Sequence, residues 1–229
     1  MRKVAVYVEG QTEYIFVREF LQRWYEYDPS QLSFSCNRLR SDKVIAAPYD
    51  FHGTDDCMNY FEITDVGNDN SVLAKILKNE SFIESAGFDC VIGLRDMYSK
   101  DYRKANPHSS EINPELNDRF IAGTTKSLEN QKTDLQISMH FAIMEVEAWI
   151  LAMLQSFPSD VDPELAIYHP AAELKRLAQQ DGGDYDKHEY EVSSIMGQLT
   201  RSDFETLLNS ERCASFRKFV EALCGGIGF

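Results

Sequence analysis

Short apolar segments alternate with segments of helical periodicity along the first two thirds of the chain. Every residue from Val4 to Val8 is apolar or aromatic, so both faces of a strand formed by residues 3–8 would be apolar. A strand of that kind lies inside a sheet that is covered on both faces. Apolar residues then recur at helical spacing, which predicts a helix over residues 12–27 that packs on the sheet.

Later segments repeat this alternation. Residues 32–39, 43–49, 60–66, 90–94 and 137–143 have the short or alternating apolar pattern of strands. Helical spacing is found over residues 71–87, 114–131 and 146–157. Strands that alternate with helices predict the α/β class, with a largely parallel sheet flanked by helices.

Two stretches depart from this alternation. Residues 97–114 are polar and charged, so we expect a surface loop beside Asp96 with no part in the core. After Pro158 the pattern predicts helices over residues 171–179, 202–208 and 211–223. It also predicts an acidic loop over residues 181–186. We interpret residues 1–157 as the α/β core and residues 158–229 as a helical C-terminal cap or lobe packed on that core.

The charge balance restricts the partners. The 229 residues include 23 lysines and arginines against 37 aspartates and glutamates, a formal net charge of -14. Such a surface opposes binding to a polyanion unless cations or a local basic patch assist. The same acidic surface could instead bind a protein partner.

Cysteine usage and the absence of long apolar runs indicate the compartment. Five widely spaced cysteines, without a Cys-x-x-Cys pair or a zinc-type cluster, are typical of reduced thiols. The apolar run that ends at Glu9 is too short for a signal peptide, and no segment is long enough to span a bilayer. We therefore expect a cytoplasmic protein with no membrane partner.

Three predicted strands run into carboxylates, which are Glu9, Asp96, and Glu145 or Glu147. The carboxyl ends of parallel strands meet at one edge of a sheet, so these side chains should converge. Clustered carboxylates repel one another unless they are protonated or neutralised, and hard oxygen ligands suit Mg²⁺ or Mn²⁺. The pattern predicts a magnesium site, with Glu9, Asp96 and Glu147 as catalytic residues and Glu145 as a further ligand.

Each acid also has a simpler interpretation. Glu9 and Asp96 could cap the turns that follow them, and Glu145 and Glu147 could be first-turn acids favoured by the helix dipole. Only the convergence of the acids favours a metal site over this interpretation.

The residues around the acids have expected supporting roles. Gly10 would permit the tight turn after the first strand, Thr12 would cap the following helix, and Glu13 would favour its first turn. Lys100 and Arg103, in the polar stretch after Asp96, could bind a phosphate.

Three motifs together resemble a known family. The segments Glu9–Glu13, Asp96–Tyr98 and Glu145–Ala148, each after an apolar strand, are similar to an uncharacterised Toprim-like family of small bacterial proteins. Toprim is the metal-binding domain of topoisomerases and primases, shared with OLD-type nucleases, and the resemblance covers residues 3–157. It implies a Toprim-like, Rossmann-like sheet in which Glu9 is a metal ligand or general acid/base. Asp96 would be the first acid of an Asp-x-Asp motif.

The sequence departs from the Toprim pattern at two positions. Tyr98 occupies the second acidic position, as in the small family itself, which puts a full two-metal site in doubt. Met144 stands where the resemblance would place a histidine, before Glu145. Glu147 is then the expected third carboxylate, with Glu145 next.

These observations lead to three functional hypotheses. The first is a Mg²⁺-dependent or Mn²⁺-dependent phosphodiesterase that cleaves DNA or RNA, in a phage-defence system. The second is a non-catalytic module that keeps the Toprim scaffold and binds another protein. The third is a phosphoesterase for a small molecule, because an acidic surface accommodates few phosphates more easily than a long polyanion.

Overall fold

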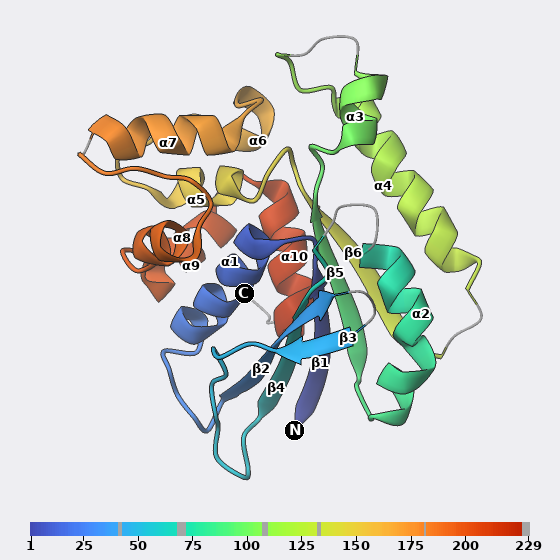
Figure 1. The fold of residues 1–229 in the computed structure, drawn as a ribbon. Coiled ribbons are helices and arrows are strands. Elements are labelled where there is room, and N and C mark those ends of the chain that lie inside the picture. Colours follow the sequence, from blue (N-terminus) through green and yellow to red (C-terminus); the bar gives the residue numbers. More distant parts are fainter. Residues whose placement is uncertain (41–42, 68–71, 107–109, 132–133, 181, 226–229) are drawn as a thin grey trace.

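A six-stranded sheet forms the centre of the molecule, with helices on both faces (Figure 1). The computed structural model describes residues 1–40, 43–67, 72–106, 110–131, 134–180 and 182–225. The strands are β1 (Arg2–Val8), β2 (Leu32–Arg40), β3 (Lys43–Ala46), β4 (Asn59–Asp65), β5 (Cys90–Asp96) and β6 (Gln136–Ala142). Their order is β3-β2-β4-β1-β5-β6, and every neighbouring pair is parallel except β2 and β3. The predicted α/β class with a largely parallel sheet is confirmed.

Ten helices surround the sheet in the described part of the chain. They are α1 (Gln11–Trp24), α2 (Val72–Ser85), α3 (Lys100–Ala105), α4 (Pro114–Glu129), α5 (Glu147–Met153), α6 (Pro163–Ala166), α7 (Pro170–Gln180), α8 (Glu189–Met196), α9 (Arg201–Leu208) and α10 (Ala214–Cys224). None of the helices in these ranges is long and apolar enough to cross a membrane.

β1 lies between β4 and β5 and is buried on both faces, as its continuous apolar run predicts. Val4, Val6 and Val8 belong to the larger core together with α1, α5 and the C-terminal helices. Ala5 and Tyr7 belong to a smaller core with α2 on the opposite face. Val8 is paired with Asp65, the last residue of β4, and with Leu94, two residues before the end of β5. The residue after Val8 therefore emerges at the carboxyl edge of the sheet.

The C-terminal helices share the larger core with the first helix. The ring of Phe20 on α1 lies 5.0 Å from that of Phe204 on α9, and Phe16 lies 5.4 Å from Trp149 on α5. Figure 1 shows α5 and α7 to α10 gathered beside α1. Residues after 157 therefore pack on the α/β core.

The polar stretch 97–114 is not a surface loop throughout, and that prediction is wrong. It contains α3, whose first turn is capped by Ser99. Met97 and Tyr102 are buried in an apolar cluster with Leu116 and Met144. Their burial fixes a short helix that the surrounding charged residues conceal in the sequence.

Other boundaries differ from the predicted ones for local reasons. α1 ends at Trp24 because Glu26 and Tyr27 have positive φ angles of 50° and 57°, which the helix cannot continue. β3 ends at Ala46 and is followed by an irregular segment. The pattern did not predict the short helices α6 and α8.

Candidate metal centre

Glu9 and Asp96 lie side by side at the carboxyl edge of the sheet. Asp96 is the last residue of β5, and Glu9 follows the last residue of β1. The Oε2 atom of Glu9 accepts a hydrogen bond of 3.0 Å from the backbone N–H of Asp96. The Glu9 N–H donates to the carbonyl of Leu94 at 3.1 Å, which ties the two strand exits together.

The chain leaves β6 through a left-handed turn that directs the next two acids to the same edge. Met144 has a φ of 63°, and its carbonyl accepts a 2.8 Å hydrogen bond from the N–H of Tyr98. The N–H of Val146 donates to Oδ1 of Asp96 at 2.9 Å. Glu145 therefore lies just before α5 and Glu147 is its first residue, both beside the end of β5. The Met144 side chain is fully buried and offers no hard oxygen ligand.

Asp96, Glu145 and Glu147 could hold one cation. Each offers a carboxylate oxygen, and these three atoms lie within 4.8 Å of one another. Glu147 is 0% exposed, and its Oε2 atom has no hydrogen-bond partner among the residues that the structure describes. An all-oxygen donor set with an unsatisfied buried carboxylate oxygen fits a hard divalent ion such as Mg²⁺ or Mn²⁺.

Glu13 belongs to this acid cluster, although the sequence indicated only a first-turn role. It is 5% exposed on α1, and its side chain is hydrogen-bonded to Asp96. Burial and the charge of Glu147 raise its pKa from 4.5 to about 7. Burial, Glu13 and Glu147 likewise raise the pKa of Asp96 well above its ordinary value. The sequence feature that could have indicated this role is the place of Glu13 in the first turn of α1, four residues after Glu9.

The expected roles of Gly10 and Thr12 need correction. α1 begins at Gln11, so Gly10 is the N-cap residue and the buried Thr12 lies inside the first turn. Gly10 has a φ of -159°, an extended conformation that other residues adopt. The turn does not depend on glycine, and Thr12 does not cap the helix.

Lys187 supplies positive charge to the cluster and was not identified from the sequence. Its Nζ atom lies 2.8 Å from Oε1 of Glu145 and 3.1 Å from Oε1 of Glu147. Burial alone would lower the pKa of Lys187, but Glu147 and Glu145 raise it above its ordinary value. A φ of 59° at Lys187 marks the local turn, and a lone lysine beside an acidic loop was the only signal in the sequence.

Other contacts orient Glu145 and Glu147. The hydroxyl of Tyr185 donates to Oε1 of Glu147 at 2.8 Å. The N–H of Ala171, at the start of α7, donates to Oε2 of Glu145 at 3.0 Å. The C-terminal helices and the segment between α7 and α8 therefore complete the site that the sheet begins.

The two proposed phosphate ligands lie on α3 and are exposed. The guanidinium of Arg103 lies 5.5 Å from the ring centre of Tyr98. The Tyr98 ring also contacts His169, at 5.2 Å between ring centres. Tyr98 and Arg103 thus form one cluster with the segment before α7, and Lys100 is the first residue of the same short helix.

A fourth strand also ends at a carboxylate. Asp65 is the last residue of β4, pairs in register with Val8, and is buried. Arg40 lies 2.9 Å from its Oδ2 atom, and the N–H of Gly67 donates to Oδ1. Asp65 is thus paired with an arginine of the neighbouring strand β2, and it is not one of the three acids whose oxygens lie within 4.8 Å of one another.

Comparisons with known proteins add little to this geometry. No family model and no curated protein matches the chain. A solved structure from Lactobacillus plantarum WCFS1, described as a candidate cell surface hydrolase, is 8% identical with a TM-score of 0.33. The match covers 76% of this chain and 62% of the other, so the chain spans less than two thirds of that structure. A likeness this weak carries no functional argument.

Proposed function

We propose that the protein is a Mg²⁺-dependent or Mn²⁺-dependent phosphodiesterase that acts on DNA or RNA. One observation carries the proposal: the oxygens of Asp96, Glu145 and Glu147 lie within 4.8 Å of one another at the carboxyl edge of the sheet. The Toprim-like motifs support the same chemistry and stay a prediction, as does a role in phage defence. With Tyr98 in the second acidic position, we expect a single cation.

The residues of the site have distinct proposed roles. Asp96, Glu145 and Glu147 would hold the cation, which when bound supplies Lewis acidity toward a phosphoryl oxygen and lowers the pKa of water. Glu9, oriented by the Asp96 N–H, lies where it could accept or return a proton. Glu13, with a pKa of about 7, can hold or release a proton at neutral pH. Lys100 or Arg103 would contact the substrate phosphate.

Cleavage assays test this proposal directly. Single-stranded and double-stranded DNA and RNA would be incubated with Mg²⁺ or Mn²⁺ and the wild type, Glu9→Gln or Asp96→Asn. We expect metal-dependent cleavage that falls at least about 100-fold in both variants. Glu211→Gln is the matched control, because it removes one exposed charge outside the site. Equal cleavage rates for the wild type and all variants, with or without metal, would contradict the proposal.

Lys187 favours a second candidate, a non-catalytic scaffold that binds a protein partner. Its ammonium group already pairs with Glu145 and Glu147, so the cluster could be a structural ion-pair network. Calorimetric titration separates the two candidates. Absence of Mg²⁺ or Mn²⁺ binding that depends on Asp96 would favour the scaffold.

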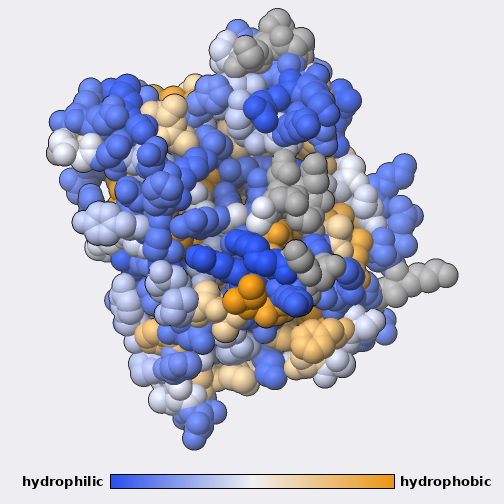
Figure 2. Space-filling view, in the orientation of Figure 1, coloured by the Kyte–Doolittle hydropathy of each residue, from blue (hydrophilic) through white to orange (hydrophobic). Residues whose placement is uncertain are grey.

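The negative surface charge favours testing a third candidate, a small-molecule phosphoesterase. The face shown in Figure 2 is mostly hydrophilic, and the chain carries a net charge of -14. Bis(4-nitrophenyl) phosphate and mononucleotides should therefore be assayed beside nucleic acid. Metal-dependent hydrolysis of these compounds without cleavage of DNA or RNA would assign the small substrate.

A further inference from the structure

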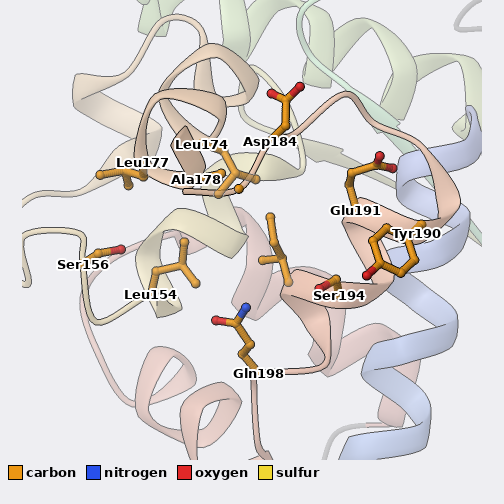
Figure 3. A pocket seen from close by; sticks show the side chains of 12 residues that line it. Leu154, Ser156, Leu174, Leu177, Ala178, Asp184, Tyr190, Glu191, Ser194 and Gln198 are labelled. Carbon is orange, nitrogen blue, oxygen red and sulfur yellow. The ribbon is translucent and has the colours of Figure 1, made fainter. Parts of the chain in front are cut away.

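A cavity of about 330 Å³ lies between α5, α7, α8 and the segment that joins α7 to α8. Its apolar lining consists of Leu154, Leu174, Leu177, Ala178 and Ile195. Figure 3 shows Leu154 and Leu177 on one side, with Tyr190 and Ser194 of α8 across from them. The volume is at the lower end of the range for small-molecule sites, roughly 300–1,000 Å³.

The charged side chains that line this cavity are both acidic, Asp184 and Glu191. Asp184 already accepts a 2.9 Å hydrogen bond from the Tyr185 N–H and lies 3.5 Å from Nζ of Lys175. Glu191 differs, because its Oε2 atom is shielded from solvent and has no hydrogen-bond partner in the described part of the chain. Oε2 is closed even to water, so a ligand in the cavity would bind through the other oxygen, Oε1. No hydrogen bond or ion pair engages Oε1 among the described residues, so a cationic N–H donor would complement it.

We propose that this cavity binds a small primary amine with an apolar body. The leucine wall would take the hydrocarbon part, and the ammonium group would pair with Glu191. Tyr190, which is 80% exposed, lines the same cavity. An anionic ligand of equal size would be repelled by both carboxylates. The proposal does not depend on the proposed metal chemistry.

Isothermal titration with three matched compounds tests the proposal on the full chain. 2-Phenylethylamine is positively charged, 2-phenylethanol is neutral and 3-phenylpropanoate is negatively charged. We expect the amine to bind at least about tenfold more tightly than the alcohol, and the carboxylate not to bind at the same concentrations. Glu191→Gln should weaken amine binding about tenfold. Glu211→Gln, the exposed control, should leave it unchanged.

A charge reversal gives a second test that does not depend on loss of binding. Glu191→Lys should abolish the preference for 2-phenylethylamine and allow 3-phenylpropanoate to bind. Equal affinities of the wild type for all three compounds, or no amine binding at millimolar concentrations, would overturn the proposal. Concentration-dependent dimerisation that Tyr190→Glu abolishes would instead assign the cavity to a second copy of the chain, and would overturn it too.

Discussion

The carboxyl group of Glu13 is buried and hydrogen-bonded to Asp96, and its protonation links the acid cluster to pH. Its pKa is 4.5 in an ordinary environment and about 7 in the folded chain. Between these values the folded state holds a proton that the unfolded state has lost. The free energy of unfolding therefore decreases as the pH rises through this window.

Glu13→Gln should reduce this pH dependence. Without divalent cations, we expect the wild type to lose on the order of 1–3 kcal/mol of stability between about pH 4.5 and 7 through this group. The variant should lose less, because glutamine cannot ionise. Urea unfolding in EDTA across this pH range measures the difference, with the exposed Glu115→Gln as control. Parallel curves for the wild type and Glu13→Gln would contradict the shifted pKa.

Lys187→Met should destabilise the folded protein. The substitution leaves Glu145 and Glu147 without their nearby ammonium group. We expect a loss of about 1–3 kcal/mol, less than for a fully buried pair because the Lys187 side chain is 38% exposed.

Thermal unfolding with and without Mn²⁺ shows what the acids do in this variant. If they form a metal site, Mn²⁺ should restore much of the lost stability by binding the folded state. A destabilised Lys187→Met protein that Mn²⁺ does not restore would support the structural ion-pair network instead. Lys104→Met, which changes an exposed lysine on α3, is the control.

At the scale of the elements, burial on both faces made β1 and β5 predictable from their continuous apolar runs. Because these two strands were predicted correctly, Glu9 and Asp96 were also expected at the carboxyl edge of the sheet, where the structure places them. The strand order was not predictable, because it depends on pairing between segments far apart in the chain. Lys187 was missed for the same reason: it reaches the site only through the packing of the C-terminal helices.

The sequence did not predict α3, because charged residues surround Met97 and Tyr102, the two buried side chains that anchor this segment. Tyr102→Ala should cost about 3–5 kcal/mol, the usual effect of removing a fully buried aromatic ring. Tyr102→Phe should cost only about 1 kcal/mol, since it loses the hydrogen bond that the hydroxyl accepts from the Asn113 N–H. Urea unfolding measures both, with Lys104→Ala as control. Equal small losses for the two tyrosine variants would show that α3 is not anchored through this ring.

At the scale of the whole molecule, one segment connects the proposed amine cavity with the acid cluster. Gly183 and Asp184 line the cavity, whereas Tyr185 contacts Glu147 and Lys187 contacts Glu145. The larger core also joins α1, α5 and the C-terminal helices. A ligand that immobilises residues 183–187 would therefore hold Lys187 in contact with Glu145 and Glu147.

Amine binding should consequently lower the affinity for Mn²⁺, because a fixed Lys187 competes with the cation for Glu145 and Glu147. We expect saturating 2-phenylethylamine to weaken Mn²⁺ binding about fivefold, at the lower end of typical coupling between sites. By linkage, saturating Mn²⁺ must weaken amine binding by the same factor, which provides an internal check. Calorimetric titration in both orders measures the two factors, and Lys187→Met should abolish them. If both ligands bind but neither alters the affinity of the other, the segment does not couple the two sites.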